Sequence, residues 1–435
     1  MTATLSRRGR FAVLFAAIGG LTFDGVELGL MPVASLSVSQ SLLGAAFTPT
    51  LGGDWFARFT AALMLGAAVG GIFLGSLGDR IGRTRALGVS ILFYSIFAGL
   101  GAFVKTQEQM LVLRFMVGLG VGGVWPNAVA LAAECWPDKS RPIIAGLMGA
   151  ALNGGILLLS QIARTWHITP ESWRWIFQLA AAPAMLGLLV LFALPESPLW
   201  LASRSRRRQE NHSGAERAGQ SLLTSAATKP GGGALGELLR SPLLRLTLIG
   251  ILLGSIPMVG AWAASKWMIP WADKIGGTSA PGYKAITQGW WALGAVLGSF
   301  FGAQIAAWLG RRKAYAMISA GATVLTSLMF LGTAPLQASF LPIVFAQGFV
   351  ATLFFGWLPL YLPELFPTQV RAAGSGIAYN VGRFATALGV LMAGALFAAM
   401  GGSYPKVGAT CGLIYLLGLI VIWWAPDTTD KKLEE

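Results

Sequence analysis

Long apolar runs separated by short polar segments recur along the whole chain. A helix that crosses the hydrocarbon core of a bilayer needs roughly 20 apolar residues, and twelve runs are about that long. We therefore predict an all-α membrane protein with twelve transmembrane helices. The first run follows a basic start, as in a signal peptide, but it is too long and contains two acids, so we predict a retained span. The predicted spans are 11–36, 56–78, 86–104, 109–133, 142–165, 173–194, 244–271, 286–309, 314–333, 339–362, 372–399 and 405–425.

One long polar segment, residues 195–241, leaves six predicted spans on either side of it. It is rich in Gly, Ser and Arg and poor in large apolar residues, which is typical of a flexible linker. We therefore predict a six-helix bundle over 1–194, a cytoplasmic linker over 195–241 and a second six-helix bundle over 242–435.

The two halves carry related loop sequences. Residues 134–141 read ECWPDKSR and residues 364–371 read ELFPTQVR, with Glu, Pro and Arg at matching places. Residues 79–87 read DRIGRTRAL and residues 307–315 read AWLGRRKAY. Both pairs fall between corresponding spans of the two halves, which indicates a duplicated six-span unit. Transporters built on this plan bind their substrate near the membrane midplane, between the repeats.

Composition and charge agree with this interpretation. The chain is 55% hydrophobic and 11% charged, whereas about a quarter of the residues of soluble domains are charged. The net charge of +14 would suggest nucleic acid in a soluble protein. With both termini cytoplasmic, however, most Lys and Arg lie on the cytoplasmic side, as the positive-inside rule requires. We expect the inner or plasma membrane and the lipid bilayer as its environment, a monomer, and no nucleic-acid partner.

Thiol and imidazole groups are too few for metal or covalent chemistry. The two cysteines, Cys135 and Cys411, form no recognisable disulfide or metal pattern, and the two histidines, His167 and His212, fall in predicted loops. We expect no metal, no cofactor and no enzymatic activity.

Two acids lie within the first predicted span, and one arginine lies within the fourth. Asp24 and Glu27 stand three residues apart, on nearly one helical face. Arg114 at membrane depth needs a partner unless it reaches the interface. The proton affinity of a carboxylate in a cavity falls when an arginine approaches and rises when the arginine withdraws. Such a carboxylate would couple transport to protons. A fixed structural ion pair and a snorkelling arginine remain alternatives.

Two glycine-containing motifs need separate interpretations. Residues 75–85 read GSLGDRIGRTR and place Asp79 and Arg83 four residues apart at a helix end, where ion pairs form. Gly118, Gly120 and Gly123 match GxGxxG, but no strand precedes them, so we predict close helix packing and not a dinucleotide site.

With these motifs the chain resembles the major facilitator superfamily. The resemblance implies two bundles that rock about a central cavity, in which spans 1, 4, 7 and 10 line the substrate path. It also implies a cytoplasmic gating cluster, in which Ala307 replaces the second acid, so that the second copy would be weaker or one-sided. The residues implied for this cluster are Asp79, Arg83, Glu134, Arg141, Glu364 and Arg371.

Further elements resemble one branch of that superfamily, the sugar porters and the aromatic-acid and sialic-acid proton symporters. They are the acids of the first span, RFMVGLGVGG at 114–123, PESPLWL at 195–201 and PELFPTQVRAAGSGIAYNVGR at 363–383. The paired acids are closer to the organic-acid symporters, although Glu27 stands where those proteins carry Asp. The resemblance implies Asp24 and Arg114 as the proton-coupling pair, with Glu27 beside them.

Aromatic and polar residues within the spans are the candidates for the substrate site. Aromatic faces with a few polar groups suit a flat organic solute. Arg383 and Lys266 would pair with an anion, unless Lys266 lies outside, near the end of the seventh span. The predicted substrate-binding residues are Trp125, Asn127, Asn153, Gln161, Trp262, Trp357, Tyr361, Tyr379, Asn380 and Arg383.

The sequence therefore predicts a secondary transporter that takes up a small organic solute, an organic or aromatic acid, together with protons, by alternating access. A sugar or organic-cation porter and a proton-antiport exporter of drugs or metabolites are alternatives within transport. A membrane receptor or membrane-embedded enzyme is the alternative outside it.

Overall fold

The computed structural model describes residues 5–136, 141–198, 200–202, 204–205, 238–241, 243–367 and 370–429. Within these residues twelve helices are long and apolar enough to cross a membrane, as predicted. Most of the predicted linker, residues 206–237, lies outside the described residues.

The first half forms six spans. Thr48 and Thr106 cap the second and fourth helices by accepting hydrogen bonds from Leu51 N and Gln109 N. Pro183 begins a new helix and divides the sixth span in two. The helices are α1 (Arg7–Leu43), α2 (Pro49–Ile81), α3 (Arg83–Leu100), α4 (Gln107–Cys135), α5 (Arg141–Thr165), α6 (Arg174–Ala180) and α7 (Pro183–Ala193), with short 3₁₀ turns η1 (Gly44–Ala46) and η2 (Gly101–Phe103).

The second half repeats this plan with more breaks. Its seventh span changes from α10 (Leu243–Val259) to a π-helical turn η4 (Gly260–Ala264), a 3₁₀ turn η5 (Ser265–Trp267) and α11 (Met268–Gly276). The remaining elements are α12 (Tyr283–Leu309), α13 (Arg311–Ser327) with η6 (Leu328–Gly332), α14 (Phe340–Glu364), α15 (Arg371–Ala399), and α16 (Tyr404–Gly412) with α17 (Ile414–Val421) and η7 (Ile422–Trp424).

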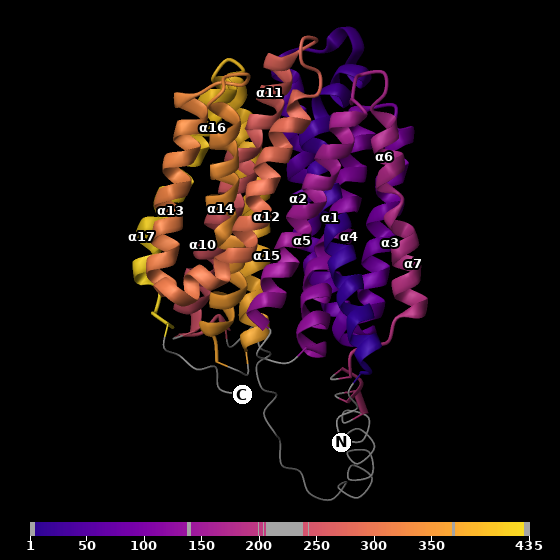
Figure 1. Cartoon of the computed structure of the whole chain (residues 1–435), viewed down its shortest axis with the longest axis vertical. Coiled ribbons are helices and arrows are strands. Elements are labelled where there is room, and N and C mark those ends of the chain that lie inside the picture. Colours follow the sequence, from indigo (N-terminus) through magenta and orange to yellow (C-terminus); the bar gives the residue numbers. More distant parts are fainter. Residues whose placement is uncertain are drawn as a thin grey trace, which may run out of the picture.

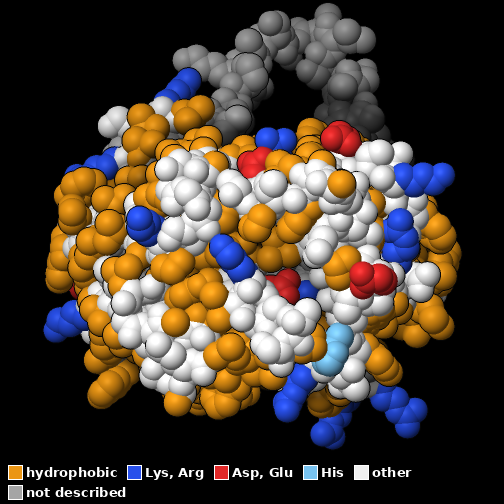
Figure 2. Space-filling model, turned by 90° about the horizontal axis from the view of Figure 1, so that it is seen from above, with side chains coloured by type: hydrophobic (Ala, Val, Ile, Leu, Met, Phe, Trp, Pro, Cys, Tyr) orange, Lys and Arg blue, Asp and Glu red, His pale blue; other side chains and the backbone are white. Residues whose placement is uncertain are grey.

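The two halves stand side by side as two bundles (Figure 1). We call the end where α1 begins and η7 ends the terminal end, and the other the opposite end. Across the bundle interface α5 packs along α12 and α2 packs along α15. Large apolar side chains such as Phe15, Phe192 and Trp308 are exposed on the outside, as a lipid-facing surface requires, and Figure 2 shows hydrophobic side chains around the rim.

Glycines bring helix backbones into contact within each bundle. A Cβ on Gly118 would lie 2.3 Å from Leu63 O of α2, and one on Gly122 would lie 2.2 Å from Ala67 O. In the second bundle a Cβ on Gly298 would lie 2.1 Å from Phe349 O of α14. The GxGxxG sequence of α4 therefore serves helix packing, as predicted.

An aromatic cluster joins the two bundles at the opposite end. Trp267 of η5 is buried against Phe56 of α2, with ring centroids 5.1 Å apart, and against Phe397 of α15, at 4.9 Å. The apolar core of the first bundle continues through Trp267 into the opposite-end half of the second bundle, while the terminal half of the second bundle has a core of its own. The bundles are therefore closed against each other at the opposite end.

Candidate functional site

A central cavity lies between the bundles and receives side chains from both. Its walls come from α1, α2, α4 and α5 on one side and from α10, η4, η5, α12, α14 and α15 on the other. The lining residues are Asp24, Leu28, Met64, Ala67, Val121, Trp125, Gly149, Leu152, Asn153, Ile156, Met258, Ala261, Trp262, Lys266, Trp291, Phe355, Tyr379, Arg383 and Thr386.

Asp24 faces this cavity from α1. Its side chain is 1% exposed, and its Oδ1 atom has no hydrogen-bond partner within the described residues. The backbones of α1 and α5 touch at this level, since a Cβ on Gly25 would lie 1.8 Å from Leu152 O. This close crossing fixes the part of α1 that carries the acid.

Glu27, and not Asp24, is the direct partner of Arg114. The two side chains form an ion pair between α1 and α4, and each is 1% exposed. Three residues along a helix correspond to a rotation of about 60°, so the two acids diverge, one toward α4 and one toward the cavity. The expected pairing of Asp24 with Arg114 is thus replaced in this structure by the pair Glu27–Arg114.

Arg383 reaches from α15 across the bundle interface. Its Nη1 atom donates to Ala67 O at 2.9 Å and to Gly122 O at 3.4 Å. Its guanidinium carbon lies 5.2 Å from the centre of the Tyr379 ring. Tyr379 in turn stacks on Trp125 of α4, with ring centroids 6.3 Å apart and planes within 7°. The cation and the aromatic stack therefore tie the second bundle to the first beside the cavity.

Asn153 of α5 also lines the cavity and bridges the bundles. Its Nδ2 atom donates to Ser299 Oγ of α12 at 2.8 Å and to Gly149 O at 3.2 Å. With Trp125, Trp262, Tyr379 and Arg383, five of the ten predicted substrate-binding residues face the cavity.

The other five lie elsewhere. Asn127 donates to Leu74 O within the first bundle, Gln161 lines a separate groove with Trp290, and Asn380 donates to Gly376 O of its own helix. Trp357 and Tyr361 are buried within the second bundle, where they donate to Arg311 O and Pro426 O. These two predictions placed the wrong face of α14 toward the substrate, because that helix is apolar on all sides.

Sequence reasoning did not assign Trp291 and Thr386 to the site. Thr386 follows Arg383 by one helical turn, so helical spacing could have found it. For Trp291, the one sequence signal was its position beside Gln288 and Trp290. Which of the two tryptophans faces the cavity depends on the rotation of α12, and the sequence does not give that rotation.

A polar network closes the terminal end of the first bundle. Arg83 pairs with Asp79 at 2.7 Å and with Glu134 at 3.3 Å, and Ser197 Oγ donates to Glu134. Glu196 Oε1 accepts from Thr84 N at 3.0 Å. The PESP segment thus belongs to the predicted gating cluster.

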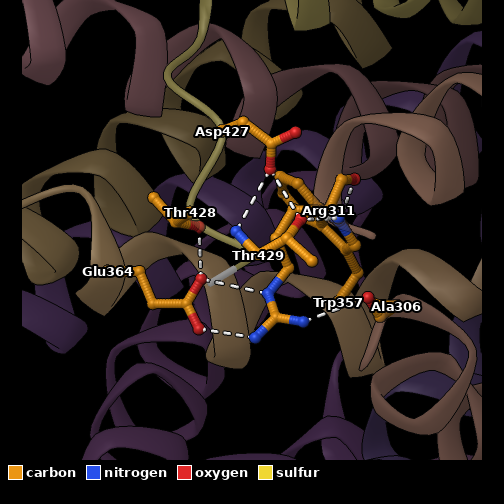
Figure 3. A network of polar contacts seen from close by, with 7 residues as sticks. All are labelled: Ala306, Arg311, Trp357, Glu364, Asp427, Thr428 and Thr429. Atoms are coloured by element: carbon orange, nitrogen blue, oxygen red, sulfur yellow. Dashed lines mark hydrogen bonds and ion pairs between the residues drawn. The ribbon is translucent and has the colours of Figure 1, made fainter. Parts of the chain in front are cut away.

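The second bundle repeats this network around Arg311 (Figure 3). Arg311 donates to both carboxylate oxygens of Glu364, at 2.8 Å and 3.0 Å, and Thr428 Oγ1 donates to the same carboxylate. Thr429 donates to Asp427 through its hydroxyl and its backbone N–H, and these hydrogen bonds hold the pKa of the Asp427 carboxyl below its ordinary value.

The two networks correspond at three positions and differ at a fourth, where Ala307 stands in place of Asp79. Arg311 matches Arg83 and Glu364 matches Glu134 in the sequence. Thr428 donates to Glu364 as Ser197 donates to Glu134. In the second copy a bidentate buried pair forms without an acid at position 307, and the expectation that this copy is weaker or one-sided stays a prediction. The sequence analysis did not assign Arg311 to the gating cluster, although the GR that the two loops share could have identified it. The side chains of Arg141 and Arg371 lie outside the described residues.

Twelve apolar helices in two related bundles around a central cavity form the fold of the major facilitator superfamily. Residues 12–435 match the family described as sugar (and other) transporter, and the chain belongs to that family. The resemblance seen in the sequence is thereby confirmed.

Several curated relatives are transporters of small molecules. The cis,cis-muconate transport protein of Acinetobacter baylyi is 28% identical, and the matched region covers 94% of this chain and 92% of that protein. The probable 4-methylmuconolactone transporter of Cupriavidus pinatubonensis is 30% identical and covers 86% and 82%. The gallate transporter of Pseudomonas putida is 28% identical and covers 90% and 86%.

Among solved structures, the inward open xylose transporter XylE from E. coli shares the fold. It has a TM-score of 0.68 at 19% identity and covers 98% of both chains. At this identity the likeness concerns the fold alone.

Proposed function

We propose that this chain takes up a small organic acid together with protons, by alternating access, in the inner membrane, with its terminal end facing the cytoplasm. The observation that carries the proposal is the charge pattern of the central cavity. Asp24, Lys266 and Arg383 are the charged side chains that line it, among aromatic walls. Two cations at membrane depth favour a substrate that carries negative charge.

Asp24 is the proposed proton carrier. Glu27 already has Arg114 as a counter-ion, whereas one buried oxygen of Asp24 has no hydrogen-bond partner in the part of the chain that the structure describes. Such a carboxyl group can bind and release a proton when the bundles move and its surroundings change from cavity to solvent. The pair Glu27–Arg114 then holds α1 against α4 and positions Asp24.

Two of the relatives support an organic acid as the substrate, because the muconate and gallate after which they are named are carboxylates. A neutral sugar would leave Lys266 without a counter-charge, and an organic cation would be repelled by Lys266 and Arg383. Export by proton antiport would use the same acid, so the direction has to be measured.

Uptake into proteoliposomes tests the proposal. With a lumen more alkaline than the outside, wild-type protein should accumulate cis,cis-muconate, gallate or benzoate. Asp24→Asn should abolish this accumulation and retain exchange of substrate. Asp54→Asn, which removes an acid paired with Arg58 away from the cavity, should behave as wild type. Proton-driven accumulation by Asp24→Asn at the wild-type rate would refute the role of Asp24.

A further inference from the structure

Lys266 is a buried cation held where the seventh span departs from α-helical geometry. It follows the π-helical turn η4 and lies in the 3₁₀ turn η5. The side chain is 1% exposed, lines the central cavity, and its Nζ atom has no hydrogen-bond partner within the described residues. An ammonium group in such surroundings needs a partner.

Aromatic faces are the contacts that the ammonium group has in this structure. Nζ lies 3.4 Å from the centre of the Trp291 ring and 5.6 Å from that of Trp262. Gln347 of α14 fixes this arrangement, because its Oε1 accepts from Trp291 Nε1 at 2.8 Å and its Nε2 donates to Ser265 Oγ at 2.6 Å. The ring and the backbone beside Lys266 are thus held by one buried amide.

The two cations of the cavity differ in how well they are satisfied. Arg383 donates to two backbone carbonyls, whereas within the described residues the Lys266 ammonium group contacts ring faces and has no hydrogen-bond partner. A ring face attracts a cation less strongly than a carboxylate does. Lys266 is therefore free to exchange Trp291 for an anionic group of a ligand, while Arg383 on a different helix provides a second positive site.

We propose that Lys266 is the anchor for a second carboxylate, so that the cavity selects dicarboxylates over monocarboxylates. The inference rests on the proposed function, since it assumes an organic acid in this cavity. One carboxylate of the substrate binds near Arg383 and the other displaces the ammonium group of Lys266 from Trp291. In the empty transporter Trp291 substitutes for the missing carboxylate.

Thermal-stabilisation titrations of the purified full chain test this with matched ligands. The pairs are terephthalate against its monoamide 4-carbamoylbenzoate, and trans,trans-muconate against sorbate. A charge-assisted contact changes affinity by about tenfold to a hundredfold, so wild type should prefer each dicarboxylate by that factor. Lys266→Gln should reduce the preference to about onefold, whereas Lys266→Arg should retain the preference. Lys274→Gln, an exposed lysine on α11, should match wild type.

The outcomes separate this inference from the proposed function. If carboxylates bind but wild type shows no preference in either pair, or Lys266→Gln keeps the preference, the inference is overturned and organic-acid transport stands. If no carboxylate stabilises wild type, the proposed function is overturned as well. Size-exclusion chromatography checks that the variant is folded. Lys266→Met provides a second neutral variant. If neither neutral variant folds, the ligand preference of the wild type alone still tests the inference.

Discussion

The ion pair between Glu27 and Arg114 is buried, so each charge depends on the other for its stabilisation. Both side chains are 1% exposed, and removal of one partner leaves a buried charge. Arg114→Met should therefore lower the free energy of unfolding by about 3–5 kcal/mol, whereas the double variant Glu27→Met with Arg114→Met should recover most of that loss. Thermal and denaturant unfolding of the purified variants measures both values.

The same double variant distinguishes a structural pair from a coupling pair. If Asp24 is the proton carrier and the pair only positions α1, the double variant should still accumulate substrate when the lumen is alkaline. A well-folded double variant that exchanges substrate but no longer accumulates it would show that Glu27 or Arg114 takes part in proton coupling.

At the scale of helices, the crossing of α1 and α5 depends on Gly155, whereas its neighbour Gly154 faces open space. A Cβ on Gly155 would lie 1.7 Å from Thr22 O, whereas one on Gly154 meets nothing within 4 Å. Both substitutions by alanine gain about 1 kcal/mol of helix propensity. Gly154→Ala should be neutral or stabilising, while Gly155→Ala should destabilise by about 1–3 kcal/mol through overpacking. Equal melting temperatures for the two variants would contradict this crossing.

The tail that follows the last helix is the second element with a testable contact. Thr428 is buried, and its hydroxyl donates to Glu364. Thr428→Val keeps the shape and removes the donor, so it should lower the free energy of unfolding by about 1.5–3 kcal/mol, the range for hydrogen bonds to charged groups. Thr428→Ser keeps a hydroxyl group and should therefore retain most of the wild-type stability. Ser197→Ala should have a similar effect in the first bundle.

The sequence predicts elements better than the faces that they present. Twelve spans follow from run length, and the acid at Asp24 is conspicuous because acids are rare at membrane depth. The break around Lys266 leaves no trace in an apolar run, because a π-helical turn changes hydrogen bonding and not composition. Trp357 and Tyr361 were misplaced because α14 is apolar all round, so no periodicity reports its rotation.

At the scale of the molecule, the two bundles differ in how they meet at each end. The aromatic cluster around Trp267 joins them at the opposite end, whereas the networks of Arg83 and Arg311 are each built within one bundle at the terminal end. Transport by alternating access would require the contacts at the opposite end to separate in each cycle. A covalent link there should consequently stop transport.

Ser160 of α5 and Gly289 of α12 are suited to such a link. A Cβ on Gly289 would lie 3.4 Å from the Cβ of Ser160, close to the spacing of about 3.5–4.5 Å found in disulfides. In a background without Cys135 and Cys411, oxidised Ser160→Cys with Gly289→Cys should lose substrate uptake. A reductant should restore it.

A link within one bundle provides the matched control, because rigid bundles do not change internally as they rock. A Cβ on Gly250 of α10 would lie 3.3 Å from the Cβ of Ala378 on α15, both in the second bundle. Oxidised Gly250→Cys with Ala378→Cys should therefore transport at the rate of its reduced form. Undiminished uptake by the oxidised Ser160–Gly289 pair, with cross-linking shown by mass spectrometry, would mean that α5 and α12 stay together throughout the cycle. The bundles would then have to separate at contacts other than those between α5 and α12.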